Sequence, residues 1–464
     1  MILIFLCSLL FIYNLELIRQ KTKMYQLPMI PSTITGIAEL TIHKLNKRTL
    51  VTPLRSSKRK TITQNQIKHL PNIIIILNES FGNTQGLPFY NANINAMPLL
   101  TNRLKNNPEW ITFKKAFTNS TATDVSVPSL LTGVSPIENS TKLHTMPLIW
   151  DWAKANNKYT FLLTSHRYSW ANFNKFFFSD SLDTHIDAET INAPIINDLG
   201  IDDTIMIQEL PNILKKIPKQ QGFVGVINTN ALHSPYQTTS ELISPPTYLN
   251  TYQKALFILD YTIDLTIRYL NQYNFNNTII IITSDHGEAS EYSYPKAHRI
   301  YSFYDAYFKI PFLMYIPKEW SKKNNTAYTN LIENSNKNIQ NIDIIPTIID
   351  ILKLENKNQN LVSLLKGHSL IKKINTDRAI IGLNTNDNRW WDQEGFGIAK
   401  DNKRMVVSTI TGIQYTDINK DPFQKNNNWQ EEKPSKKEAL LKTINKNHHL
   451  NRIWKLSSTI TNNQ

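Results

Sequence analysis

Long runs of apolar residues alternate with segments of helical pattern along most of this chain. Two of the runs, at 71–77 and 278–282, contain four consecutive isoleucines. Uninterrupted runs of this kind are typical of strands buried on both faces, like the central strands of a parallel sheet. Further strands are predicted at 159–164, 222–228 and 310–317, and helices at 97–104, 141–157, 250–273 and from 343 onward. This alternation predicts an α/β fold with a mostly parallel sheet that helices cover on both faces.

The pattern changes after residue 374 to shorter, alternating segments. Residues 397–407 contain a lysine-rich turn between two such segments, which predicts a hairpin within a small antiparallel appendage. We expect one globular domain at 71–424, followed by a polar tail at 425–464 that forms a helix and a frayed end.

The beginning of the chain is strongly apolar. Residues 2–13 carry no charge, and the segment extends to residue 18 as a predicted membrane anchor, 1–18. A basic, polar connector at 19–70 follows. Its first basic residues, between 19 and 23, argue against export of what comes next, by the positive-inside tendency.

The composition of the chain excludes some kinds of site chemistry but leaves the kind of binding partner open. The 464 residues carry a net charge of +14, which either favours an anionic partner or reflects lysines that are simply solvated. No ribonucleoprotein or zinc-finger signature accompanies the charge, so we expect no nucleic-acid partner. The one cysteine, Cys7, lies in the apolar segment, and this excludes disulfides and cysteine-ligated zinc from the globular part.

Polar side chains follow the two isoleucine strands at the point where each strand ends. Glu79 follows the first strand, and Asp285 and His286 follow the second. Ligands of open α/β sheets bind at the carboxyl ends of the strands. Carboxylate oxygen together with imidazole nitrogen suits zinc. The sequence therefore predicts a metal site at this edge of the sheet.

A hydroxyl-rich segment at 119–133 supplies a candidate nucleophile. It becomes apolar after Pro128, like the start of a helix. A hydroxyl at a helix N-terminus lies among free backbone N–H groups that favour a phosphate or sulfate oxyanion, and contact with zinc would activate it. Taken alone, this segment is better explained as a serine- and threonine-rich helix cap.

Four short motifs together resemble the sulfatase-like branch of the alkaline phosphatase superfamily. They are Asn-Glu-Ser at 78–80, Thr-Ala-Thr-Asp-Val-Ser-Val-Pro at 121–128, Leu-His-Ser-Pro-Tyr at 232–236 and Ser-Asp-His-Gly-Glu at 284–288. Within this branch the chain is most similar to bacterial phosphoethanolamine transferases that modify lipid A, over roughly 71–410. The resemblance implies an alkaline-phosphatase-like, three-layer sandwich with a mostly parallel central sheet.

The resemblance also implies a role for each matching residue. Thr123 would be the nucleophile, and His233 and His298 would protonate leaving groups or orient phosphate oxygens. The implied zinc ligands are Glu79, Thr123, Asp285 and His286. The implied substrate contacts are Thr121, Glu288, His166 and Arg167, the last two because 165–172 resembles a substrate loop of phosphoglycerol transferases.

The implied reaction moves phosphoethanolamine from phosphatidylethanolamine to lipid A, or to another cell-envelope glycan, through a phosphothreonine intermediate. It would occur at the bacterial inner membrane, with the catalytic domain in the periplasm. Alternatives are phosphoglycerol transfer, a sulfatase-like hydrolase, and a non-catalytic domain that senses lipid. Two departures bear on the choice: Asn119 and Ser129 stand where relatives carry a cysteine pair, and Leu130 replaces the arginine of the sulfatase formylglycine motif.

Overall fold

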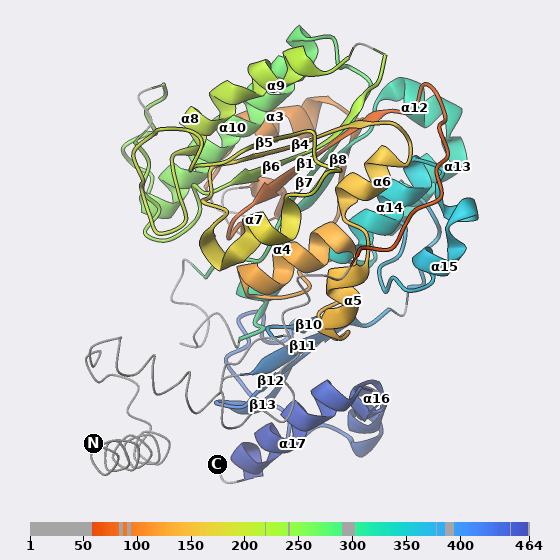
Figure 1. Ribbon diagram of the computed structural model, residues 1–464. Helices are drawn as coiled ribbons and strands as arrows, with labels where there is room; N and C mark the ends of the chain where they lie inside the picture. The colour runs from red at the N-terminus through yellow and green to blue at the C-terminus, as the bar shows by residue number, and fades with distance from the viewer. Residues whose placement is uncertain are drawn as a thin grey trace, which may run out of the picture. The chain divides into compact units, whose positions relative to one another are not determined.

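The architecture of this protein is drawn in Figure 1 from a computed structural model. The structure describes residues 58–82, 87–90, 94–218, 220–239, 242–289, 302–376, 378–385, 394–445 and 447–462. The predicted anchor at 1–18, the connector up to residue 57 and the candidate His298 lie outside these residues. Within the described ranges, no helix is long and apolar enough to cross a bilayer.

The centre of the domain is a seven-stranded sheet in the order β2-β8-β7-β1-β6-β4-β5. Its strands are β1 (Asn72–Asn78), β2 (Trp110–Thr112), β4 (Tyr159–Thr164), β5 (Thr184–Ile186), β6 (Phe223–Thr229), β7 (Thr278–Ser284) and β8 (Phe312–Tyr315). The five strands from β7 to β5 run parallel, whereas β8 and β2 are antiparallel additions at one edge. The predicted mostly parallel sheet is therefore confirmed.

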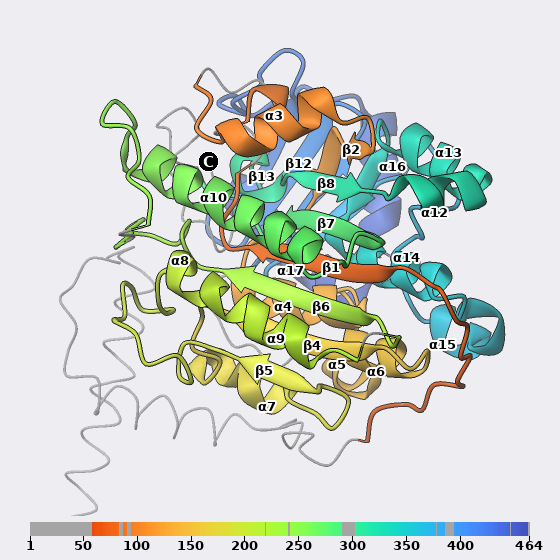
Figure 2. The ribbon, with the colours of Figure 1, turned by 90° about the horizontal axis from the view of Figure 1, so that it is seen from above.

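Helices cover both faces of this sheet, as Figure 2 shows from above. Ile74 and Ile76 of β1 pack with α3 (Pro98–Asn106), α9 (Leu210–Lys216) and α10 (Thr251–Gln272). Ile73 and Ile75 point to the opposite face and its separate core. The helices that contribute to that second core include α4 (Thr123–Thr132), α5 (Ser140–Thr145), α6 (Ile149–Lys154), α7 (Phe173–Phe177) and α14 (Ile344–Ile351). Because the side chains of a strand alternate, the four isoleucines of β1 supply both cores.

Shorter elements complete the main domain. They are β3 (Lys115–Phe117) paired with β9 (Asn338–Gln340), and the helices α8 (Asp203–Met206), α11 (Asp305–Phe308), α12 (Lys318–Lys323), α13 (Asn325–Asn334) and α15 (Gln359–Val362). The single helix predicted at 141–157 is wrong, because α5 and α6 are separate there. Pro147 lies between them and cannot donate the hydrogen bond that a continuous helix would need.

The predicted antiparallel appendage is confirmed as a four-stranded sheet. It consists of β10 (Ile380–Leu383), β11 (Gly395–Lys400), β12 (Lys403–Ser408) and β13 (Gly412–Asp417), and it is followed by α16 (Pro434–Asn445) and α17 (His448–Asn462). Leu450 and Ile453 of α17 are buried against this sheet. Arg404 of β12 forms an almost fully buried ion pair with Asp305 of α11, 2.6 Å apart, which links the appendage to the main domain.

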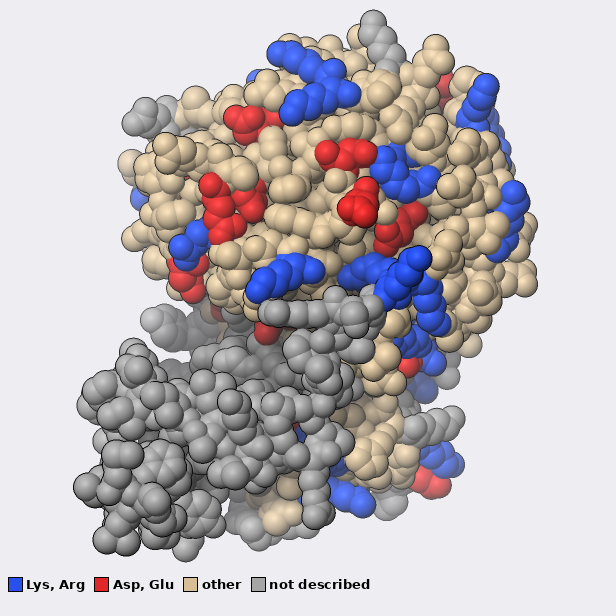
Figure 3. All heavy atoms as spheres, viewed as in Figure 1, with Lys and Arg blue, Asp and Glu red and all other residues tan. Residues whose placement is uncertain are grey.

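Neither acidic nor basic side chains form one continuous patch on the face drawn in Figure 3. Acidic and basic side chains are interspersed on that face. The net charge of the sequence therefore does not translate into one continuous basic surface there, which agrees with the interpretation of many lysines as solvating groups.

Candidate active site

Three candidate metal ligands converge at the carboxyl ends of β1 and β7. These strands pair in parallel register, with Asn78 opposite Ser284, so the residues that follow them lie side by side. One ligand atom from each of Glu79, Asp285 and His286 lies within 4.8 Å of the others. His286 Nε2 is 3.3 Å from Glu79 Oε1 and 3.4 Å from Asp285 Oδ2. All three side chains are buried.

Hydrogen bonds orient the ligands of this cluster, and Ser80 Oγ donates to Glu79 Oε1 at 2.8 Å. Asp285 Oδ1 accepts from the backbone N–H groups of Ser80 (3.0 Å) and His286 (2.7 Å). Asp285 Oδ2 is buried and accepts no hydrogen bond from the described residues. His286 Nδ1 lies 2.9 Å from the Gly287 carbonyl, which can only accept, so Nδ1 carries a proton and Nε2 faces the carboxylates. The donor set therefore fits a divalent cation such as zinc.

The electrostatics of the cluster also favour a bound cation. Burial raises the pKa of Asp285 to about 7, and the charge of Glu79 adds to this shift. Burial also opposes ionisation of Glu79, but the hydrogen bond and charge of His286, with the charges of His233 and His166, hold the pKa of Glu79 well below its usual range. Two adjacent buried carboxylates thus compete for charge, and a bound cation would stabilise both in the ionised form.

Thr123 brings a hydroxyl to the same point. It is the first residue of α4, and the preceding Ala122 caps the helix without a side-chain hydrogen bond. Thr123 Oγ1 lies 3.1 Å from His286 Nε2 and 3.4 Å from both carboxylate oxygens of Glu79. The hydroxyl is therefore directed at the ligand cluster rather than used as a helix cap.

A buried amide and hydroxyl network lies behind this hydroxyl. Ser126 Oγ donates to the Asp285 carbonyl at 2.7 Å, and Thr118 Oγ1 donates to the same carbonyl. The backbone N–H and side-chain amide of Asn119 donate to Asn341 Oδ1 at 3.0 and 2.8 Å. Asn341 Nδ2 in turn donates to Thr118 Oγ1 (3.3 Å) and Ser126 Oγ (3.4 Å). Asn119, noted in the sequence as replacing a cysteine, thus has a polar partner that the sequence did not reveal.

Two histidine loops approach the cluster from β4 and β6. His166 follows β4 and is buried, and its Nε2 donates to the Thr229 carbonyl at 2.8 Å. His233 follows β6, and its Nδ1 donates to the Ser234 carbonyl at 2.7 Å. The fully buried Asp203 joins the loops by accepting from Ser165 Oγ (2.5 Å) and from the backbone N–H groups of residues 230 and 231 (2.7 and 2.9 Å). Sequence reasoning missed Asp203, since nothing local distinguishes it from Asp202.

The remaining predicted contacts lie at different depths. Thr121 is buried two residues before Thr123. Glu288 Oε1 accepts from the Ala289 N–H at 3.1 Å, and its side chain is partly exposed. Arg167 Nη2 donates to the Asp198 carbonyl at 2.9 Å, so its guanidinium holds a neighbouring loop.

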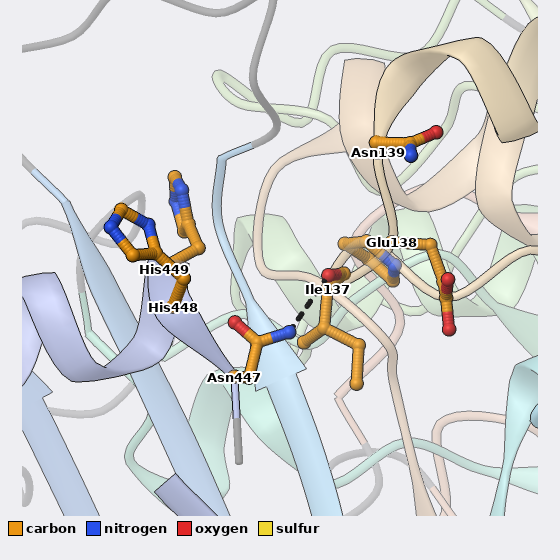
Figure 4. Close-up of a pocket in the computed structure, with 7 residues that line it drawn as sticks. Ile137, Glu138, Asn139, Asn447, His448 and His449 are labelled. Atoms are coloured by element: carbon orange, nitrogen blue, oxygen red, sulfur yellow. Dashed lines mark hydrogen bonds between the residues drawn. The ribbon is translucent and has the colours of Figure 1, made fainter. Parts of the chain in front are cut away.

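A separate pocket of about 270 Å³ lies between the loop after α4 and the start of α17 (Figure 4). Its lining includes Glu138, His448 and His449, and Asn447 Nδ2 donates across it to the Ile137 carbonyl at 3.1 Å. None of its lining residues is among the predicted site residues.

This fold and site together define a class of protein. A parallel α/β sandwich that gathers two carboxylates, an imidazole and a helix-terminal hydroxyl at its carboxyl edge is the arrangement of the alkaline phosphatase superfamily. The family model described as Sulfatase matches residues 71–354, which is more than half of the chain. The chain belongs to the sulfatase family. Among curated proteins no match is found.

Several solved structures share the fold at low identity. Ps i-CgsB in complex with k-i-k-neocarrahexaose is 17% identical, covers 84% of this chain and 94% of its own, and has a TM-score of 0.62. The C-terminal periplasmic domain of EcEptC from Escherichia coli in complex with Zn is 16% identical over 72% of this chain and 96% of its own, with a TM-score of 0.55. The integral membrane lipooligosaccharide phosphoethanolamine transferase A (EptA) from Neisseria meningitidis is 17% identical over 79% and 71%, with a TM-score of 0.53. At these identities the similarity shows the fold alone.

Proposed function

We propose that this chain is a zinc-dependent transferase that moves phosphoethanolamine from phosphatidylethanolamine to lipid A or another envelope glycan. The observation that carries the proposal is the hydroxyl of Thr123, which is directed into the cluster of Glu79, Asp285 and His286. Zinc held by these residues, with Thr123 as the fourth ligand, would supply Lewis-acid chemistry that favours the ionised hydroxyl. The Zn-bound EcEptC domain and EptA support the choice of metal and reaction.

The reaction proceeds as two displacements. The Thr123 hydroxyl releases its proton to solvent, and Oγ1 attacks the phosphorus of the donor while the bond from phosphorus to the diacylglycerol oxygen breaks. His233 or His298 donates a proton to that leaving oxygen. An acceptor oxygen, on a phosphate or a sugar hydroxyl, then gives its proton to the same histidine and attacks phosphorus. The bond to Thr123 breaks, and the hydroxyl is restored.

Substrate contacts come from the loops around the cluster. Thr121 and Arg167 are proposed to contact phosphate oxygens. Burial lowers the pKa of His166 and so favours the neutral form of its ring. We propose that this neutral ring lies beside the anionic substrate. Glu288 is proposed to pair with the substrate amine, because its carboxylate is partly exposed three residues after Asp285.

The donor and acceptor are lipids of the envelope, so the proposal includes a place for the enzyme. We propose a catalytic domain in the periplasm, held at the bacterial inner membrane by the apolar segment at 1–18. The periplasmic EcEptC domain and the integral membrane EptA support this location.

A sulfatase-like hydrolase is the second candidate, because the chain belongs to the sulfatase family and Ps i-CgsB shares its fold. Leu130 stands where the formylglycine motif requires arginine, and this favours phosphoryl transfer over sulfate-ester cleavage. Phosphoglycerol transfer remains an alternative for the head group, motivated by the loop at 165–172.

The test combines trapping of the intermediate with product analysis. Full-length protein is incubated with phosphatidylethanolamine with and without lipid A. The sample without lipid A is quenched in acid and digested, and its peptide containing Thr123 is analysed by mass spectrometry; the sample with lipid A is analysed for the modified lipid. We expect a phosphoethanolamine adduct and modified lipid A, both absent in Thr123→Ala. Thr132→Ala is the matched control, because Thr132 lies in the same helix and its hydroxyl donates only to backbone carbonyls of that helix.

The metal is tested separately, by elemental analysis of protein purified without chelators. We expect about one tightly held zinc per chain, lost in Asp285→Asn.

Full transfer activity in Thr123→Ala would refute the assignment of Thr123 as the nucleophile. Release of sulfate from a carbohydrate sulfate ester would favour the sulfatase-like hydrolase.

A further inference from the structure

We propose that Asp202 and Asp203 are positioning residues that fix the loop of His233 for proton transfer to the leaving oxygen. This inference rests on the proposed function, in which His233 is a candidate donor of that proton. The two aspartates lie at the start of α8, and both side chains are buried. Their carboxylates bind backbone groups at both ends of the loop at 230–239, which follows β6.

Asp203 holds the near end of this loop. Its Oδ1 accepts from the Asn230 N–H at 2.7 Å, and its Oδ2 accepts from the Ala231 N–H at 2.9 Å. The Asn230 carbonyl in turn accepts from the His233 N–H at 2.9 Å. These residues therefore form a turn whose first two N–H groups are bound by one carboxylate and whose last residue is His233.

Asp202 holds the far end of the same loop. Its Oδ2 accepts from the Thr239 N–H at 2.6 Å, while its Oδ1 accepts from the N–H and hydroxyl of Thr204 at 2.8 and 2.7 Å and so caps α8. Between the two ends, the His233 side chain keeps 16% of its surface exposed, so a substrate can reach it. A ring on a loop that is fixed at both ends meets a substrate in one orientation, which proton transfer to one particular oxygen requires.

The segment that carries the two aspartates is itself fixed against the loop after β4. Ser165 Oγ donates to Asp203 Oδ1 at 2.5 Å, and the Ser165 carbonyl accepts from the Ile201 N–H at 2.9 Å. A Cβ on Gly200 would lie 1.8 Å from the same carbonyl oxygen, so only glycine permits this close approach. The start of α8 can therefore hold the His233 loop in place, because it does not depend on that loop for its own position.

The experiment measures how the rate depends on the leaving group in full-length protein. One donor is phosphatidylethanolamine, whose diacylglycerol oxygen must gain a proton as it leaves. The other is p-nitrophenyl phosphoethanolamine, whose nitrophenolate is a stable anion and leaves without a proton. Loss of a correctly placed proton donor should therefore slow transfer from the first donor much more than transfer from the second.

Two variants weaken the loop contacts to different extents. Asp203→Asn keeps the size of the side chain but replaces one accepting oxygen with an NH2 group, so a backbone N–H of the turn loses its partner. Asp202→Asn retains the cap of α8, because asparagine is a good cap, and loses only the bond to Thr239. If Asp203→Asn does not fold, Asp202→Asn supplies the same test.

Asp260→Asn is the matched control. Asp260 is equally buried and also accepts from two backbone N–H groups, those of Leu99 and Leu100 at 2.7 and 2.8 Å. It holds the start of α3 instead of the His233 loop. Its substitution should lower stability without changing the ratio of the rates for the two donors.

In Asp203→Asn we expect kcat with phosphatidylethanolamine to fall by roughly 10- to 100-fold, as for a misplaced general acid, and kcat with the nitrophenyl donor to change little. Asp202→Asn should show the same pattern with a smaller loss. His233→Gln should reproduce the pattern, and adding Asp203→Asn to it should cause no further loss, because both changes remove one function. Hydrogen–deuterium exchange of the amides at 230–239 should be faster in Asp203→Asn and unchanged in Asp260→Asn.

Equal losses with both donors in Asp203→Asn, or losses that multiply in the double variant with His233→Gln, would overturn the proposal. Unchanged hydrogen exchange at 230–239 would also overturn it, whether or not the protein is active. If the unmodified protein transfers phosphoethanolamine from neither donor, the proposed function fails. Faster exchange in Asp203→Asn would then leave the anchoring of the loop by Asp203 in place.

Discussion

Asn341→Ala removes the amide at the centre of the network behind Thr123. The side chain of Asn341 accepts two hydrogen bonds from Asn119, at 2.8 and 3.0 Å, and donates two longer ones. Each buried hydrogen bond contributes about 1 kcal/mol net, and a stranded backbone N–H costs about 1–3 kcal/mol. Because the Asn119 N–H has Asn341 Oδ1 as its partner and is buried, we expect the free energy of unfolding to fall by about 2–4 kcal/mol.

The same substitution should also weaken the metal site. The Thr118 and Ser126 hydroxyls both accept from Asn341 and both donate to the Asp285 carbonyl, so they connect the network to a candidate ligand. Loss of partners that orient metal ligands lowers metal affinity roughly 10-fold or more. We therefore expect zinc to be released to a competing chelator at a lower chelator concentration than in the unmodified protein.

Urea unfolding followed by circular dichroism measures the first effect, and chelator competition followed by elemental analysis measures the second. Asn336→Ala is the control, because Asn336 is exposed and donates only a 3.5 Å bond to a neighbouring serine. Its stability should stay within about 0.5 kcal/mol of the unmodified protein. A loss below about 0.5 kcal/mol in Asn341→Ala, with unchanged zinc retention, would refute the reasoning.

Two further substitutions test the surroundings of the site. In Gly287→Ala the new Cβ would lie 2.2 Å from the Ala306 carbonyl oxygen, so α11 or the turn at His286 must move. We expect a stability loss of about 1–3 kcal/mol and weaker zinc binding. Unchanged urea unfolding and zinc content would contradict this prediction. Burial raises the pKa of Asp203 from the unfolded value of 3.8 to about 7. The folded state therefore favours the protonated carboxyl group. The stability that this protonated group contributes is fully present below about pH 4 and is lost as the pH rises through about 7. The stability penalty of Asp203→Asn should therefore be larger at pH 5 than at pH 8 in urea unfolding, and the reverse order would mean that its three donors outweigh burial.

The core of the fold follows from features that sequence displays directly. The isoleucine runs of β1 and β7 predicted fully buried strands, because only a strand with helices on both sides can bury every side chain. Once those strands are parallel, the residues that follow them must share one edge, which brings Glu79 beside Asp285 and His286. The helix prediction at 141–157 failed for a local reason, since Pro147 interrupts an otherwise continuous apolar pattern.

The supporting residues could not be predicted in the same way, because their function depends on partners far away in the sequence. Asn341 acts on a segment more than two hundred residues earlier, and its neighbours in sequence give no sign of this. Asp203 is one of two consecutive aspartates; its neighbour caps α8, whereas Asp203 is buried between the loops of β4 and β6. Strand ends place the groups proposed to carry the chemistry, whereas single buried amides and carboxylates fix the loops on which those groups lie. Substitution of Asn341 should therefore weaken metal retention, and substitution of Asp203 should change the pH dependence of stability. Neither residue contacts the metal cluster.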